Sequence, residues 1–207
     1  MPTRKPKDLT TTSYAVLGLL AIQPWSAYEL AKQMKRSMAF VWPAAERSVY
    51  DEPKNLLAHG LVKAKTESTG QRERTVYRIT PAGRKALAAW LTQESAPPSF
   101  QSEAMLRATF AEFGTKDDLL ATLRRFRADA AALRAGAEAV ARSYIAGDAL
   151  FPQRQHIVAL NGVFILDWSQ LAEKWATWAE SIVEQWDDTA TPEQFADALA
   201  EFSRHLR

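Results

Sequence analysis

The chain has 207 residues, of which 47% are hydrophobic and 24% charged, proportions typical of a folded globular protein and not of a disordered one. It contains no cysteine, which excludes disulfides, thiolate metal sites and a cysteine nucleophile. The net charge of +2 conceals an uneven distribution: residues 1–92 carry 15 Lys and Arg against 7 Asp and Glu (+8), whereas residues 93–207 carry 11 against 17 (−6). This asymmetry indicates that only the first part meets a polyanion.

The first residues raise the question of targeting. Residues 1–9 hold two prolines and four charged side chains, and we expect them to form a mobile arm. The apolar run 14–22 that follows resembles a secretory signal, but Trp25 stands where cleavage requires a small residue. No stretch reaches the ~20 apolar residues that span a bilayer. A cytoplasmic protein is therefore expected, and the lack of cysteine fits that compartment.

Three helices are predicted next along the chain. Residues 10–22 form a short buried helix, which Pro24 ends. Ser26 and Glu29 have the spacing of a capping box, in which the serine hydroxyl and the glutamate each satisfy a free backbone N–H. A second helix therefore begins there and runs to about Met38. A third is predicted over 44–58, and Gly60 suits the left-handed position that closes a helix.

The hydrophobic period then changes from 3.6 to 2, which predicts a β-hairpin. Its strands are residues 61–65 and 75–79, with the turn at 68–71. Thr80 and Pro81 supply the cap and first-turn proline of a fourth helix ending near Leu91. The hairpin carries five basic residues, Lys63, Lys65, Arg72, Arg74 and Arg78. Because strand side chains alternate, the three arginines share one face and Glu73 points away.

The rest of the chain is predicted to be helical beyond a linker at 94–99. A short helix covers 102–113, Thr115 caps a long one, a second long helix begins near Pro152, and Thr191 caps a terminal helix. Each long helix has an apolar stripe. The first, with heptad-like spacing, consists of Leu119, Leu123, Phe126, Ala130, Leu133, Ala137, Val140 and Tyr144. The second consists of Ile157, Leu160, Phe164, Trp168, Leu171, Trp175, Trp178, Ile182 and Trp186.

Signatures of enzymes are absent from the sequence. It contains no G-x-G-x-x-G, no phosphate-binding G-x-x-x-x-G-K-[ST], no G-x-S-x-G and no H-E-x-x-H. The three histidines are far apart. We expect no catalytic site, no metal and no cofactor. By contrast, three helices followed by a basic hairpin match a winged helix-turn-helix, in which the third helix enters the major groove and the hairpin reaches flanking phosphates.

The segments 13–34 (SYAVLGLLAIQPWSAYELAKQM), 49–62 (VYDEPKNLLAHGLV) and 75–91 (TVYRITPAGRKALAAWL) resemble the PadR-like transcriptional regulators. The resemblance covers about residues 10–91, and the remainder is similar to that family only in helix order. It implies a winged-helix DNA-binding domain over 1–93 and a helical dimerisation domain over 100–207. The implied protein is a homodimeric repressor on an inverted-repeat operator, commonly released by a small molecule.

The resemblance also implies site residues. Ser48, Val49 and Tyr50 fall where the recognition helix faces DNA, with Tyr50 bonding a phosphate and Arg47 or Lys54 reaching base edges or backbone. Tyr28 matches a phosphate-contacting aromatic, and Arg72 and Arg74 lie at the wing tip. Two departures stand out: Ala27 replaces a usual glycine, and Pro53 lies inside the recognition helix. Proline removes a helical hydrogen bond, so the helix is expected either to kink at 51–53 or to restart there. Asp51 and Glu52 add negative charge near the DNA-facing side.

The tryptophans of the second stripe allow two interpretations. They can form a hydrophobic seam for core and dimer packing, with Leu123, Phe126, Phe164, Leu171, Trp178 and Ile182 as the predicted dimerisation residues. They can also line a pocket for a small aromatic effector, and Trp168 and Trp175 are the candidates for it.

The fold class predicted from these observations is mainly α with a small β-hairpin wing. The function predicted is transcription regulation by sequence-specific binding to double-stranded DNA. Two alternatives stay open. One is a winged-helix module for protein interaction or oligomerisation that binds no specific DNA. The other is an enzyme whose catalytic groups converge from distant positions in the helical half.

Overall fold

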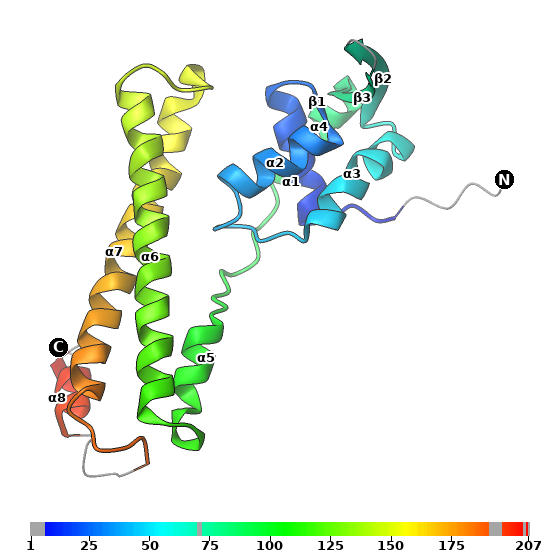
Figure 1. Cartoon of the computed structure of the whole chain (residues 1–207). Coiled ribbons are helices and arrows are strands. Elements are labelled where there is room, and N and C mark those ends of the chain that lie inside the picture. Colours follow the sequence, from blue (N-terminus) through cyan, green and yellow to red (C-terminus); the bar gives the residue numbers. More distant parts are fainter. Residues whose placement is uncertain (1–6, 70–71, 191–195, 205, 207) are drawn as a thin grey trace. The chain divides into compact units, whose positions relative to one another are not determined.

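The computed structural model describes residues 7–69, 72–190, 196–204 and 206, and the chain divides into two compact units, Met1–Pro97 and Pro98–Arg207 (Figure 1). Residues 94–102, which include the predicted linker, belong to no helix or strand. The predicted cap at Thr191 and the start of the predicted arm lie outside the described residues. Among the helices of the described part, none is both long and apolar enough to cross a membrane.

The N-terminal unit has the predicted order of helices and hairpin. Its elements are α1 (Thr11–Ile22), β1 (Trp25–Ser26), α2 (Ala27–Ser37), α3 (Glu46–Ala58), β2 (Val62–Thr69), β3 (Arg72–Ile79) and α4 (Pro81–Leu91). The strands form one antiparallel sheet in the order β1-β3-β2. Strand β1 was not predicted, because two residues are too few to show a period. The hairpin strands are also longer than predicted.

The core of the N-terminal unit is built around α1. Val16, Leu17, Leu19 and Leu20 of this helix are buried, and its other sides carry the half-buried Tyr14, Ala15, Ala21 and Ile22. Apolar side chains thus lie all round α1, as expected of a helix enclosed by others. The helices and strands around it contribute their inward-facing apolar residues, Leu30, Met34, Val49, Leu56, Val62, Val76 and Tyr77. This burial is the main stabilising contribution to the unit.

The capping box predicted at α2 is confirmed. The Ser26 hydroxyl accepts from the Glu29 backbone N–H at 3.3 Å, and Glu29 Oε2 accepts from the Ser26 backbone N–H at 2.8 Å. The capping box thus satisfies two backbone N–H groups, those of Ser26 and Glu29, that have no partner within the helix. The start of α2, which carries Tyr28, is therefore fixed beside the sheet.

Helix α3, the expected recognition helix, continues through Pro53 as one helix from Glu46 to Ala58. A restart at Pro53 is therefore wrong, because this residue lies beyond the first turn. Proline cannot donate to the Val49 carbonyl, which costs helical stability. In compensation the Pro53 ring is buried to the same extent as Val49 and Leu56, the other inward-facing residues of α3.

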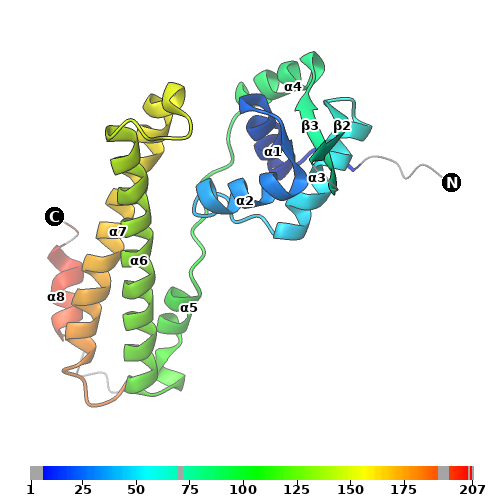
Figure 2. The same cartoon turned by 45° about the horizontal axis from the view of Figure 1, so that its top comes forward.

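The C-terminal unit is a pair of long helices with shorter ones beside it. Its elements are α5 (Glu103–Thr109), η1 (Ala111–Phe113), α6 (Lys116–Ile145), η2 (Pro152–Arg154), α7 (Gln155–Val183) and α8 (Ala196–Arg204). Figures 1 and 2 both show α6 and α7 side by side and antiparallel along most of their length. The predicted fold class, mainly helical with a small hairpin, is confirmed.

The face that α7 turns towards α6 differs from its predicted apolar stripe. The buried residues of α7 are mostly small, namely Ser169, Ala172, Ala176, Ala179, Glu180 and Val183. Small residues let two helix backbones approach closely, and this seam serves the packing within the chain. The larger side chains of the stripe lie beside the seam, where Phe164 and Leu171 are 59% and 65% exposed.

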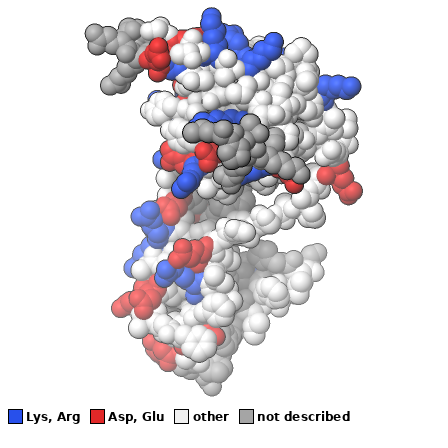
Figure 3. Space-filling view, turned by 90° about the vertical axis from the view of Figure 1, so that its right-hand side faces the viewer, with Lys and Arg blue, Asp and Glu red and all other residues white. Residues whose placement is uncertain are grey.

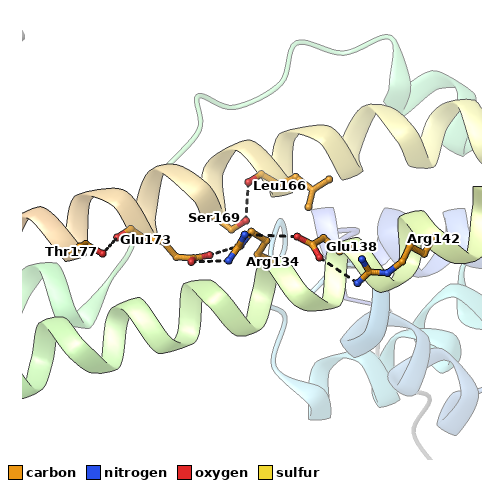
Figure 4. Close-up of polar contacts among 7 residues, drawn as sticks. All are labelled: Arg134, Glu138, Arg142, Leu166, Ser169, Glu173 and Thr177. Atoms are coloured by element: carbon orange, nitrogen blue, oxygen red, sulfur yellow. Dashed lines mark hydrogen bonds and ion pairs between the residues drawn. The ribbon is translucent and has the colours of Figure 1, made fainter.

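Ion pairs between α6 and α7 join the long helices at several levels. Arg134 donates to both carboxylate oxygens of Glu173, at 2.7 and 3.0 Å, and is shown with its neighbours in Figure 4. One heptad earlier on α6, Arg127 lies 3.3 Å from the buried Glu180, which is seven residues later on α7. The equal and opposite spacing fixes the antiparallel register of the two helices.

Candidate DNA-binding surface and an aromatic cavity

The exposed side of α3 carries the predicted DNA-facing residues. Val49, which the resemblance places on the DNA-facing side, is instead buried with Pro53 and Leu56 at helical spacing. The opposite side of α3 is left to solvent. Arg47, Ser48 and Lys54 are exposed there, and Asp51 is exposed among them. The structure thus brings a serine and two cations to one helix face, with a carboxylate at its centre.

The two tyrosines differ in accessibility. Tyr28 is the second residue of α2 and is 64% exposed, so its hydroxyl can reach an approaching phosphate. Tyr50 lies on α3 and is half-buried.

The register of the hairpin places most of its charges on one face. Lys63 is opposite Arg78, and Glu67 is opposite Arg74. Residues directly opposite one another in an antiparallel pair share a face, and side chains two apart along a strand share it too. Among the described side chains, four cations (Lys63, Lys65, Arg74 and Arg78) and the carboxylate of Glu67 therefore lie on this face. Figure 3 shows Lys and Arg gathered at several places on the N-terminal unit, with fewer carboxylates among them. The side chain of Arg72, predicted at the wing tip, lies outside the described residues.

Arg74 is held by two carboxylates of its own chain. Its guanidinium donates to Glu29 Oε1 at 3.1 Å and lies 3.6 Å from Glu67. Glu67 also lies 3.8 Å from Arg78. The pKa of Glu29 is held below its ordinary value, first by the hydrogen bond from the Ser26 backbone, and further by the Ser26 hydroxyl and the charge of Arg74, against the opposing effect of partial burial.

Sequence reasoning missed both carboxylate partners. Glu29 was assigned only a capping role, and its contact with Arg74 spans 45 residues of sequence, so no local pattern reveals it. Glu67 was not considered because the predicted strands ended before it. Extending the hairpin register from Val62 and Ile79 would have placed it opposite Arg74.

The predicted dimerisation residues fall into three groups in the C-terminal unit. Phe164 and Leu171 are exposed, whereas Phe126, Trp178 and Ile182 are half-buried. Leu123 is buried with Leu119 and Val183 in the core of its own unit. The exposed pair on α7 is therefore the part of this set that is accessible to a second copy of the chain.

An aromatic cavity of about 510 Å³ lies within the C-terminal unit, between α5, α6 and α7. Trp175, Trp178 and Trp186 line it. Trp168, the other tryptophan of the predicted effector site, is not among the lining residues, and its ring centroid lies 6.0 Å from that of Phe100. Of the two candidate tryptophans, Trp175 therefore lines the cavity and Trp168 does not.

Among the residues that the structure describes, no group of acidic, histidine or cysteine side chains is arranged to hold a metal ion. The two carboxylates around Arg74 are held by that guanidinium.

Comparison with known proteins agrees with these observations. Residues 16–89 match the model of the transcriptional regulator PadR-like family, and the resemblance inferred from the sequence is thereby confirmed. The chain is 31% identical over 99 residues to the negative transcriptional regulator PadR of Bacillus subtilis. That alignment covers 47% of this chain and 54% of PadR, so the chain spans about half the length of this relative.

Solved structures show the same fold over most of the chain. The structure of Bacillus subtilis PadR in complex with operator DNA has a TM-score of 0.71 with 21% identity, covering 84% of this chain and 99% of that one. The structure of the same protein in complex with p-coumaric acid has a TM-score of 0.65 with 19% identity, covering 85% and 100%. At 19–21% sequence identity, the similarity to these structures concerns the fold alone.

Proposed function

Residues 16–89 belong to the PadR-like family of transcriptional regulators, and on that premise we propose that the chain is a sequence-specific DNA-binding regulator. The observation that carries this proposal is the exposed face of α3, with Arg47, Ser48 and Lys54 directed outward from a helix whose other side is buried. A single helix of this kind fits the major groove of DNA. A cytoplasmic location follows, because the regulator must reach its operator.

The two exposed surfaces of the N-terminal unit have different roles in this proposal. Arg47 and Ser48, near the start of α3, contact base edges, which distinguish one sequence from another. Tyr28, Tyr50 and Lys54 contact phosphates. On the wing, Arg72, Arg74 and Lys63 also contact phosphates, which position the protein without reading sequence.

A homodimer is proposed for the C-terminal unit. The exposed Phe164 and Leu171 of α7 are aligned on one side of the helix, seven residues apart, and large apolar side chains aligned in this way mark interaction surfaces. A two-fold dimer would present its recognition helices about one DNA turn apart, ~34 Å, so the operator should be an inverted repeat.

Repression, with release by a small aromatic ligand, completes the proposal. It is supported by the relative, which is described as a negative regulator, by the p-coumaric acid complex of that protein, and by the tryptophan-lined cavity in this chain.

Footprinting on the DNA that flanks the coding region of this protein tests the proposal. We expect protection of an inverted repeat whose half-site centres are about 10 base pairs apart. Protection of no site, together with equal binding of flanking and random duplexes, would favour the alternative of a winged-helix interaction module.

The division of roles has its own test. Arg47→Ala and Ser48→Ala should change the preference between the protected site and a mutated one, by about 1–3 kcal/mol for each base that the variant no longer recognises. The pair Arg72→Ala and Arg74→Ala should weaken both duplexes equally. If both sets of variants weaken both duplexes alike, the assignment of base reading to the start of α3 is wrong.

A further inference from the structure

The aromatic cavity of the C-terminal unit has a distinct electrostatic character. Its volume of about 510 Å³ lies in the range of small-molecule sites. Three indole rings line it, and among the described lining residues Glu112 is the only one that carries a charge. An indole face attracts cations through its quadrupole. The three rings and the Glu112 carboxylate therefore both favour a positively charged ligand.

Two basic side chains beside the end of α7 already have partners within the chain. Lys116 Nζ donates to the backbone carbonyls of Glu184 and Trp186 at the end of α7. Arg124 pairs with Glu184 at 3.1 Å and with Glu180 at 3.7 Å. Neither basic residue lines the cavity, so an anionic ligand would find no opposite charge among its described walls.

A second hollow in the same unit provides a contrast. It lies along α5 and α6, measures about 1050 Å³, and has both Arg107 and Arg125 in its walls. These guanidinium groups already pair with Glu103 at 2.7 Å and Asp129 at 3.1 Å. Asp118 adds a third carboxylate to the walls of this hollow. The larger hollow therefore presents both signs of charge, whereas Glu112 is the only charged residue among the described walls of the aromatic cavity.

The walls of the aromatic cavity come from several elements that are tied together. Glu112 belongs to η1, Trp175 and Trp178 belong to α7, and Trp186 follows α7. The segment after α7 is attached to the start of α6, because the Thr189 hydroxyl, which lines the cavity, donates to the Gly114 carbonyl at 3.1 Å. Trp175 is further braced by Phe126, whose ring meets it edge-on with centroids 5.5 Å apart.

We propose that this cavity is a ligand site for planar aromatic cations and that it discriminates against planar aromatic carboxylates. The tryptophans supply stacking surface and Glu112 supplies the opposite charge. A carboxylate of the same size would be placed against Glu112, and like charges at close range repel. The inference takes from the proposed function only that the ligand is a small aromatic molecule, and it narrows that class by charge.

Isothermal titration calorimetry on the full chain, without DNA, tests this. The probe is 1-methylquinolinium, and the matched anion of similar size is 2-naphthoate. We expect saturable binding of 1-methylquinolinium, with one ligand per chain, at least about tenfold tighter than that of 2-naphthoate. Trp178→Leu should weaken the cation roughly tenfold, as expected for the loss of a desolvated cation–π contact.

Glu112→Gln is the decisive variant, because Glu112 is exposed and its change leaves the core intact. It should weaken 1-methylquinolinium about three- to fivefold, the range of a solvent-exposed ion pair, and should strengthen 2-naphthoate. Asp167→Asn is the control: it removes the same charge from an exposed position of α7 that does not line the cavity, and both affinities should stay unchanged.

Three results would overturn the inference: no binding of 1-methylquinolinium, equal or tighter binding of 2-naphthoate, or identical behaviour of the two carboxylate variants. A cavity filled by a second copy of the chain would give the first of these. None of these results depends on DNA. Failure of the proposed ligand site is therefore distinguishable from failure of the proposed DNA-binding function, which would appear as an absence of duplex binding.

Discussion

Arg74 of the wing has two carboxylates within reach of its guanidinium, Glu29 at 3.1 Å and Glu67 at 3.6 Å. A phosphate that approaches the wing must compete with them. The basic character of the hairpin could be predicted from its composition, but this competition could not, because it depends on the register of β2 against β3 and on a contact with α2. Glu67 thus lowers the positive charge that the wing offers to DNA.

Glu67→Gln should tighten binding to random duplex DNA. Removing this carboxylate frees Arg78 for phosphates and leaves Arg74 with Glu29 as its remaining partner. Exposed pairs of this kind contribute up to ~1 kcal/mol, so we expect a gain of about two- to fivefold at low salt. Glu73→Gln is the control, since Glu73 is on the opposite face of the hairpin. Equal gains from both variants, measured by fluorescence anisotropy, would show that only the overall charge matters.

Glu29 makes the stability of the N-terminal unit depend on pH. Because its pKa is lowered from 4.5 in the folded state, the charged carboxylate stabilises the fold at pH values above 4.5, and this contribution is lost as the pH falls through the lowered pKa. Glu29→Gln should cost under ~1 kcal/mol at neutral pH, since glutamine also completes a capping box.

At a pH well below 4.5 that cost should shrink, because the carboxylate of the wild-type protein takes up a proton as the pH falls through its lowered pKa. Hydrogen exchange of the α2 amides at the two pH values measures it. A cost that is the same at both would show that the charge of Glu29 contributes nothing to the fold.

At the scale of elements, the positions of the helices and of the hairpin followed from capping residues and from hydrophobic period, which are local signals. The packing face of α7 did not. The sequence predicts that a stripe of large apolar residues on α7 packs in the core and in a dimer. In the structure the small residues Ala172, Ala176 and Ala179 face α6 instead. Alanine carries little periodic signal, and close approach of two helices is a property of the pair. The course of α3 through Pro53 likewise depends on the core that buries the proline.

The junction between α4 and the hairpin depends on the absence of a side chain at Gly83. A Cβ there would lie 2.1 Å from the Leu61 carbonyl oxygen, which also accepts a hydrogen bond from the Thr80 hydroxyl at 3.0 Å. Gly83→Ala should therefore lower the free energy of unfolding of the N-terminal unit by about 2 kcal/mol or more, as overpacking does.

Gly18→Ala is the matched comparison, because a Cβ on this residue of α1 meets no atom within 4 Å. It should raise the free energy of unfolding by about 0.5–1 kcal/mol, the gain in helix propensity. Urea denaturation measures both variants. Destabilisation by Gly18→Ala as large as that by Gly83→Ala would contradict the close approach of α4 to Leu61.

At the scale of the whole molecule, the opposite charges of the two halves agree with their proposed roles. The basic excess belongs to the part that contains α3 and the wing, and the acidic excess belongs to the part with the long helices. The uneven charge distribution predicts that only the first part of the chain meets a polyanion, and the family match of residues 16–89 supports this prediction. The charge selectivity of the aromatic cavity could not be predicted, because Glu112 and the tryptophans lie on different elements.

The salt dependence of binding to duplex DNA tests the central claim most directly. If each protomer of a dimer contacts about four phosphates, log K should fall against log salt concentration with a slope of roughly −7. Fluorescence anisotropy with a labelled duplex that contains the footprinted repeat, between about 50 and 200 mM salt, gives this slope. A slope near −7 supports a dimeric regulator that binds the phosphate backbone through its basic unit. A slope near zero would contradict DNA binding by this surface.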